Sequence, residues 1–271
     1  MTSRSLRLLL AGVLLAGCQT TASERSASAV AVPTAEPALA TPTPTARPTV
    51  TATPTVIPTD SPSPIPTPTL PPATVFAFDL YEEGDFVPQH TFEWCVGASI
   101  QMAHNLVQPE VRSSYADQQE LWELARDRSS NSFNGANPRG WAATLTEIGL
   151  GPYELVSIPD YDEALRTAAA ALHATERPVG LVMWRGHHAW VMSGFTAMGD
   201  PSVHPDFAVT GIRVLDPLYP HGSGTWGSSP EPNTLLSPEE LATQFVVREP
   251  RRWSSDLGTG YLLVLPVSAE G

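Results

Sequence analysis

Cys95 is the residue of this sequence best suited to nucleophilic chemistry. Apart from Cys18, which is assigned below to lipidation, it is the only cysteine of the chain, so it has no intramolecular disulfide partner. The apolar pattern that begins at Cys95 predicts a helix start, where unpaired backbone N–H groups and the helix dipole stabilise a thiolate. A free cysteine is as often a small buried apolar residue, so its position alone leaves both interpretations open.

A thiolate nucleophile also requires a base and a group that orients it. His187 and His188 precede the apolar run 189–195, and Asp216 follows the next apolar run. A carboxylate there can accept the histidine N–H, hold one tautomer and support the imidazolium. Because Pro217 follows it, Asp216 can equally be a turn residue.

Gln89 is the candidate donor to an oxyanion. It lies six residues before Cys95, and a short loop of that span can return its carboxamide beside the Cys95 backbone amide. Two such donors stabilise the negative charge that develops on a carbonyl oxygen. Without the neighbouring cysteine, a glutamine in a loop is usually a solvated side chain.

Hydrophobic periodicity predicts an α+β order, with helices in the first half of the domain and an antiparallel sheet in the second. Asn137 and Asp160 are predicted N-caps. Residues 75–80 are a short apolar piece, and residues 219–237 form a long loop that either covers a binding cleft or is inert surface. The predicted helices cover residues 95–107, 115–128, 138–148, 161–172 and 238–245, and the predicted strands cover 179–184, 188–197, 209–216 and 261–267.

The helix that Cys95 begins is predicted to be central. Val96, Ile100, Ala103 and Val107 form one apolar stripe, and a second stripe starting at Cys95 lies beside it. Most of the circumference of this helix is therefore suited to burial.

The order of these motifs resembles that of the papain-like cysteine peptidases, most closely the peptidase C39-like family. Residues 95–102, Cys-Val-Gly-Ala-Ser-Ile-Gln-Met, resemble its Cys-x-x-Ala-Ser-x-x-Met pattern. Arg177-Pro178-Val179 resembles its Arg-Pro-Val strand, and Asp216-Pro217 resembles its Asp-Pro pair. The resemblance spans roughly residues 84 to 218.

The resemblance implies a papain-like fold, in which a helical N-terminal half with a buried central helix packs on an antiparallel sheet from the C-terminal half. It implies that Cys95 is the nucleophile, His188 the base and acid, Asp216 the orienting group and Gln89 the oxyanion donor. No cofactor and no metal is implied.

Two features depart from the family pattern or complicate it. Val96-Gly97 replaces the more usual Gly-Pro after the nucleophile, and the histidine is doubled. His188 is preferred to His187 because it lies six residues before Gly194, the interval that the family pattern shows.

The N-terminus predicts export and lipid anchoring. Arg4 and Arg7 precede an apolar run that is too short to span a bilayer as a mature helix. The run ends in Leu-Ala-Gly-Cys18, which resembles the bacterial lipobox, so residues 1–18 are a predicted lipoprotein signal peptide and Cys18 the lipidated residue. The alternative is ordinary cleavage with an incidental cysteine. We expect an extracytoplasmic protein anchored by lipid to the bacterial cell membrane.

Residues 19–74 are predicted to be a disordered linker, because 13 of the 28 prolines lie between Pro33 and Pro72. In polyproline II geometry this stretch reaches on the order of 100 Å. The globular domain is therefore predicted at residues 75–271.

The charge of the chain excludes strong nucleic-acid binding. The net charge is −13 and there is no lysine. A domain this acidic is expected to disfavour strongly acidic substrates and to tolerate basic ones. We expect a monomer whose partners are a peptide or protein substrate and, through the lipid, a membrane.

Three functions compete. The first is hydrolysis of a peptide amide, or its transfer to an amine, through a Cys95 thioester. The second is a catalytically inert papain-fold module that binds peptide or glycan. The third is a metal site, which is disfavoured because the sequence has no helical histidine pair at i, i+4 and no cysteine ligands. Its candidate ligands are His187, His188, His204, Asp206 and His221.

Overall fold

The computed structural model describes residues 70–131, 135–252 and 254–268. Every described residue belongs to one compact unit. The predicted signal peptide, Cys18 and most of the predicted linker lie outside the described residues. Among the helices that are described, none is long and apolar enough to cross a membrane.

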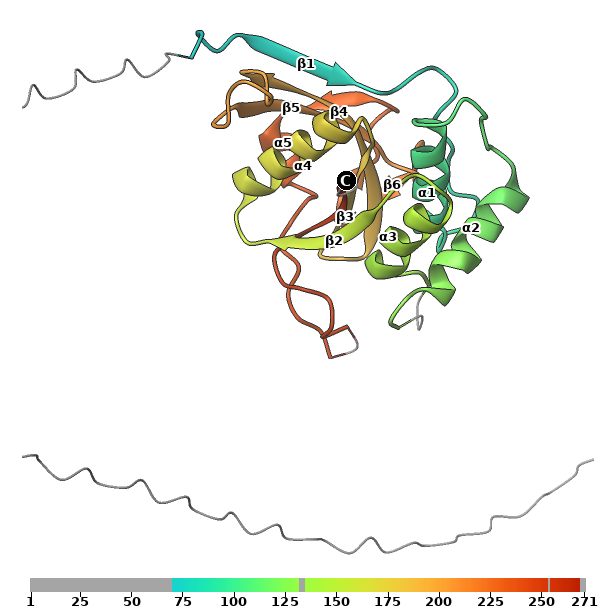
Figure 1. The fold of residues 1–271 in the computed structure, drawn as a ribbon. Helices are drawn as coiled ribbons and strands as arrows, with labels where there is room; N and C mark the ends of the chain where they lie inside the picture. The colour runs from blue at the N-terminus through green and yellow to red at the C-terminus, as the bar shows by residue number, and fades with distance from the viewer. Residues whose placement is uncertain (1–69, 132–134, 253, 269–271) are drawn as a thin grey trace, which may run out of the picture. The chain divides into compact units, whose positions relative to one another are not determined.

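The described residues form a seven-stranded antiparallel sheet in the order β2-β9-β3-β4-β5-β8, with β1 also paired to β4 (Figure 1). A separate two-stranded ribbon pairs Gly222–Ser223 (β6) with Gly227–Ser228 (β7). The strands of the main sheet are β1 Val75–Asp79, β2 Tyr153–Ile158, β3 Val179–Met183, β4 His188–Met198, β5 Ala208–Leu215, β8 Thr234–Leu236 and β9 Tyr261–Pro266.

The long strand β4 is the centre of this sheet. Its first half pairs with β3, from Met183↔His188 onward, and its second half pairs with β1, up to Asp79↔Gly194. Gly194 is required where β1 comes close, because a Cβ there would lie 2.5 Å from the carbonyl oxygen of Phe78. The two strands therefore follow one another along the same edge of β4.

All of the described helices except α1 begin at a residue whose side chain caps them. The side chain of Asn137 accepts from Gly140 N–H, and that of Asp160 accepts from Glu163 N–H, as predicted. The helices are α1 Cys95–Asn105, α2 Tyr115–Asp127, α3 Pro138–Glu147, α4 Tyr161–Thr175 and α5 Pro238–Ala242.

The helices cover the two faces of the sheet separately (Figure 1). Helices α1, α2 and α3 pack on one face and α4 and α5 on the other. Alternate residues of β4 serve the two cores: Ala189 and Val191 face the α1 side, and Trp190 and Met192 face the α4 side. The sheet is therefore buried on both faces where β4 begins.

Helix α1 is the buried central helix that was predicted. All of its residues after Cys95 are buried. Gly97 allows α2 to approach, because a Cβ there would lie 2.8 Å from the Cβ of Trp122. The Val-Gly pair that departs from the family pattern thus has a packing reason.

The predicted α+β class is confirmed, but the first half of the domain is not purely helical. Strands β1 and β2 come from it and join the sheet. β2 was missed because Glu154 and Ser157 interrupt its apolar run, which an edge strand tolerates. The last helix ends at Ala242 and not at residue 245, and the stretch 219–237 contains β6, β7 and β8.

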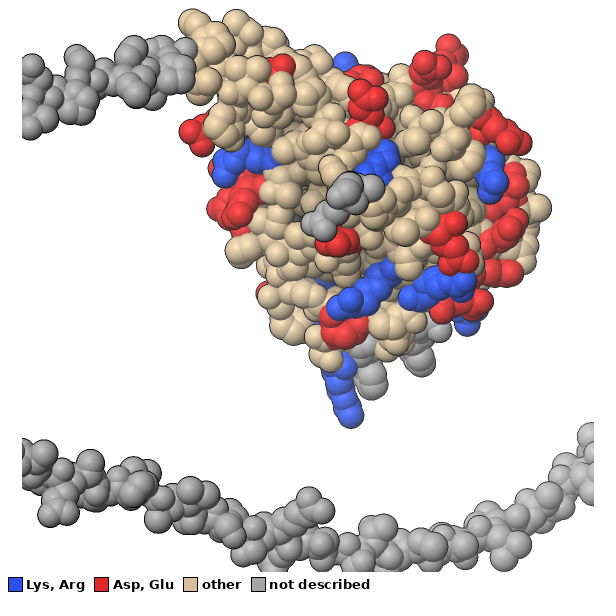
Figure 2. Space-filling model, viewed as in Figure 1, with Lys and Arg blue, Asp and Glu red and all other residues tan. Residues whose placement is uncertain are grey.

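The surface is acidic, and several arginines are used in ion pairs. Figure 2 shows Asp and Glu side chains spread over much of the face in view. Arginine–carboxylate pairs among the described residues are Arg128–Glu147 at 2.8 Å, Arg139–Asp256 at 3.4 Å and Arg213–Asp79 at 3.1 Å.

Candidate active site

Cys95 is the first residue of α1, as predicted, and it is a half-buried free thiol. The N-cap residue Trp94 provides no side-chain acceptor, and the first turn contains no acidic residue. The first helical hydrogen bond joins Ala98 N–H to the Trp94 carbonyl at 2.9 Å, so the preceding N–H groups have no acceptor within the helix. The sulfur therefore lies at the positive end of the helix dipole.

His188 and Asp216 form a buried pair. The two side chains are 4% and 0% exposed, and His188 Nε2 lies 2.7 Å from Asp216 Oδ1. The same oxygen accepts from Leu218 N–H at 2.8 Å, while Oδ2 has no hydrogen-bond partner among the described residues. The imidazole is thus the main group that can balance the charge of this carboxylate.

Cys95 completes the arrangement from the other side of the ring. Burial by itself would lower the pKa of His188, but hydrogen bonds to Asp216 and Cys95, together with the charges of both, raise that pKa from 6.5 to about 9. Because Nε2 is bonded to Asp216, Nδ1 is the ring nitrogen left for the thiol. The geometry favours an imidazolium between two acidic groups.

Two tertiary contacts bring these elements together. Ser99 Oγ donates to the Ala189 carbonyl at 3.4 Å, which fastens α1 to the start of β4. Leu215, at the end of β5, pairs with Val191 of β4, so Asp216 projects beyond the paired region beside His188.

Trp184 covers the histidine. Its ring stacks on that of His188 with 4.1 Å between centroids and 22° between planes, and its Nε1 donates to Gln244 Oε1 at 2.9 Å. Trp184, Arg185 and Gly186 all have positive φ, which turns the chain tightly from β3 into β4. The indole shields the His188–Asp216 bond from water, and this strengthens the bond.

Gln89 lies on a loop that is fastened near Asp216. Its backbone N–H donates to the Pro217 carbonyl at 2.7 Å. The buried Gln118 side chain holds the residues on either side, because it accepts from His90 N–H at 2.7 Å and donates to the Pro88 carbonyl at 3.1 Å.

The carboxamide of Gln89 uses only part of its hydrogen-bonding capacity. Nε2 donates one hydrogen to the Thr91 carbonyl at 3.0 Å, and Oε1 has no hydrogen-bond partner among the described residues. Gln89 lines a smaller cleft of about 340 Å³ with Tyr219 and His221, and not the cleft that contains Cys95. The structure therefore places Gln89 near the Asp216 loop, and no hydrogen bond joins it to Cys95 among the described residues.

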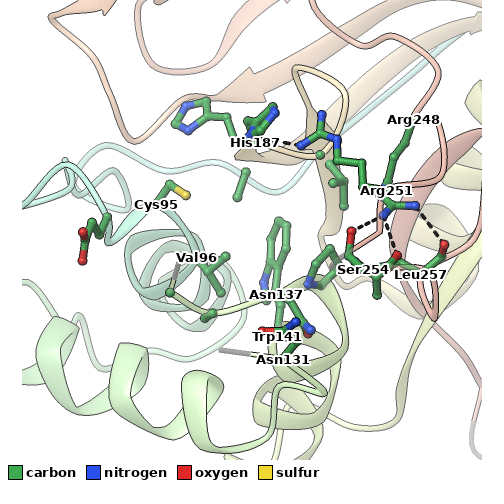
Figure 3. A pocket seen from close by; sticks show the side chains of 18 of the residues that line it. Cys95, Val96, Asn131, Asn137, Trp141, His187, Arg248, Arg251, Ser254 and Leu257 are labelled. Carbon is green, nitrogen blue, oxygen red and sulfur yellow. Dashed lines mark hydrogen bonds between the residues drawn. The ribbon is translucent and has the colours of Figure 1, made fainter. Parts of the chain in front are cut away.

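Cys95 and His188 open on a cleft of about 440 Å³ (Figure 3). Its apolar lining includes Phe92, Trp141 and Leu257, and its far wall carries His187, Arg248 and Arg251. The long stretch 219–237 contributes nothing to this lining and borders the smaller cleft instead.

His187 has a different environment from its neighbour. It is partly exposed, and its Nδ1 lies 3.4 Å from Arg251 Nη1. Burial of the ring and the Arg251 charge lower the pKa of His187. The structure brings His188, and not His187, to Asp216.

The remaining candidate metal ligands are dispersed. His221 borders the smaller cleft, and His204 lies in the turn after Asp200, where its N–H donates to the Asp200 carbonyl. Across residues 70–131, 135–252 and 254–268, no three His, Cys, Asp or Glu side chains gather closely enough to hold a metal ion.

Sequence reasoning missed several residues that shape the site. Trp184 stacks on His188, four positions away, and Gln118 bonds the backbone of His90 and Pro88, 28 and 30 positions away. Nothing in their local sequence distinguishes them from ordinary polar or aromatic residues. Arg248 offered a weak signal, since it is a charge that directly follows the apolar pair Val246-Val247.

Comparison of the chain with protein-family models and with curated proteins finds no match in either.

Proposed function

We propose that this chain is a cysteine peptidase of the papain-like type. The observation that carries the proposal is the buried His188–Asp216 pair, whose imidazole lines the same open cleft as Cys95 and has its pKa raised by both Asp216 and Cys95. Nucleophile, base and orienting group in this order are the requirements of acyl transfer through a thioester.

The chemistry follows from the two ring nitrogens of His188. The Cys95 thiolate attacks the carbonyl carbon of a peptide bond, and the C–N bond breaks as His188 passes its Nδ1 proton to the leaving amine. Neutral His188 then takes a proton from water, whose oxygen attacks the thioester, and the carboxylic acid and the thiolate are released. Asp216 holds Nε2–H throughout, so only Nδ1 exchanges protons with the reactants.

The raised pKa of His188 supports this cycle. With a pKa of about 9, the ring is protonated at neutral pH and can serve as the acid for the leaving amine. Gln89 has one amide hydrogen that makes no hydrogen bond, and it is the proposed side-chain donor to the oxyanion. The loop at residues 88–91 would have to adjust for this amide to reach the oxygen of the carbonyl group that Cys95 attacks.

The cleft itself suits a peptide. Phe92 is 88% exposed at its rim, and Trp141 and Leu257 are buried in its wall, so it offers both a docking surface and an apolar floor.

The direct test is mass spectrometry of a peptide library after incubation with the wild-type chain and with Cys95→Ala. We expect new cleavage products with the wild type alone. A library that stays intact, together with a Cys95 that reacts with iodoacetamide no faster than a free thiol at pH 6, would favour the inert binding module.

A pair of histidine variants tests the assignment of the base. His188→Ala should move the alkylation profile of Cys95 to higher pH, because the imidazolium that supports the thiolate is lost. His187→Ala is the matched control and should move it little. The opposite result would show that the base is His187.

We also propose that the enzyme acts outside the cytoplasm, anchored by lipid at Cys18. The support is the N-terminal sequence alone, with its basic residues, short apolar run and Leu-Ala-Gly-Cys end.

A further inference from the structure

The wall of the cleft that faces Cys95 carries charge opposite to that of the chain. Arg248 and Arg251 both line it, as does His187, whereas Glu93 is the one Asp or Glu in its described lining. Figure 3 shows Cys95 on one side of the cleft and the arginines on the other. In a chain with 15 arginines and 28 acidic residues, two arginines in one cleft need an explanation.

Arg248 is a buried cation without a carboxylate partner among the described residues. It is 2% exposed, and its guanidinium donates to the carbonyls of Leu257, Gly258 and Ser254 at 2.7 to 2.8 Å. Carbonyl groups solvate a cation but do not cancel its charge. The cleft therefore keeps a fixed positive charge in its wall.

Two acidic groups near this wall, Asp256 and Glu93, do not neutralise it. Asp256 is close enough for its charge to act on Arg248, but it is paired with Arg139. Glu93 forms no ion pair with Arg248 or Arg251 within the described part of the chain.

Arg251 presents donors on the surface of the same wall. Its Nη2 donates to the Arg185 carbonyl at 2.9 Å, and its Nη1 lies 3.4 Å from His187 Nδ1. These two contacts orient the guanidinium and leave other N–H groups for a ligand. When His187 Nδ1 accepts from Arg251, the remaining ring nitrogen carries a hydrogen and becomes a further donor.

We propose that this wall binds a carboxylate of the peptide substrate, held by Arg251 and His187 over the buried charge of Arg248. The inference rests on the proposed function, because it names the peptides that the same cleft would take. It reverses the preference expected from net charge, since a local pair of arginines outweighs acidic groups spread over the surface. The carboxylate comes from an acidic side chain or from the free C-terminus of the peptide.

The first test uses two alkylating reagents of nearly equal size, iodoacetate and iodoacetamide, on the full chain. The ratio of their rates at Cys95 reports the potential in the cleft and does not require peptide turnover. Arg251→Gln should lower the iodoacetate-to-iodoacetamide ratio by about tenfold, the lower end of electrostatic steering effects. Arg251→Lys should retain most of the ratio, because it keeps the charge.

Arg166→Gln is the matched control, because it removes the same charge from α4, which packs on the other face of the sheet. An equal loss of the ratio in this control, or no loss in Arg251→Gln, would overturn the proposal. Arg248 is left unchanged in these variants because its bonds hold residues 254–258 in place.

The second test measures binding without chemistry. The Cys95→Ala chain is equilibrated in dialysis with a pool of matched peptides that contain either Glu or Gln at one position and end in either a free or an amidated carboxyl group. Enrichment of the Glu peptides assigns the site to an acidic side chain, and enrichment of the free-acid peptides assigns it to the C-terminus. Enrichment of neither group would refute the carboxylate site.

Different experimental results would refute the peptidase function and the carboxylate site. If the wild type leaves the whole pool uncut while Cys95→Ala still enriches acidic peptides, the peptidase function is wrong and the carboxylate site stands. If the pool is cut without regard to charge, the peptidase function stands and the carboxylate site is wrong.

Discussion

Replacing Asp216 by Asn should lower the pKa of His188. The carboxylate oxygen at 2.7 Å from Nε2 becomes a neutral amide oxygen that can still accept from the ring and from Leu218 N–H. A pKa of about 9, against an ordinary value of 6.5, means that the folded protein favours the imidazolium by about 3 kcal/mol, at about 1.4 kcal/mol for each pH unit. With the charge gone and the burial unchanged, we expect the midpoint to fall by about one pH unit or more.

The assay is an NMR titration of the histidine ring resonances of the full chain. The two adjacent histidines are distinguishable, because the pKa of His188 is raised whereas burial and Arg251 lower that of His187. The resonance that titrates near pH 9 should disappear in His188→Ala and persist in His187→Ala. A midpoint that stays near 9 in Asp216→Asn would refute the role given to this carboxylate.

The same ionisation should appear in the stability of the domain. Because the folded-state pKa of His188 lies above its unfolded value, its contribution to stability is fully present below pH 6.5 and is lost as the pH rises through 9. The free energy of unfolding in urea should therefore fall by up to about 3 kcal/mol over this interval. Asp216→Asn should reduce that fall, and an unchanged slope would contradict the linkage.

Three further outcomes are expected. Gln89→Ala should cut peptide turnover by about two orders of magnitude and leave alkylation of Cys95 nearly unchanged, because it acts on the oxyanion and not on the thiolate; parallel losses in both rates would argue against this role. Gly97→Val should lower the free energy of unfolding in urea by about 1–3 kcal/mol, since its Cβ would lie 2.8 Å from the Cβ of Trp122. An unchanged midpoint of urea unfolding would show that α2 moves to accommodate the added side chain without loss of stability. Cys18→Ser should release the protein from the membrane fraction, and its retention there would show that the anchor is misassigned.

Much of the fold follows from local patterns. The helix at Cys95, the caps at Asn137 and Asp160 and the strands that begin at Val179 and His188 were all predicted, because periodicity and capping act over a few residues. Helix ends were less accurate, as α4 continues to Thr175 before the left-handed residue Glu176 stops it. Strand β2 escaped prediction because its stability comes from pairing with β9, more than a hundred residues away.

By itself, the sequence determined the types of the elements and the position of Cys95 at a helix start. The tertiary structure decided which of two adjacent histidines meets Asp216, because His187 still belongs to the turn beside Arg251, whereas His188 begins β4 and lies beside the end of β5. It also decided the charge of the cleft. Arg248 and Arg251 lie about 150 residues after Cys95, and only the folded chain puts their charge across from the thiol.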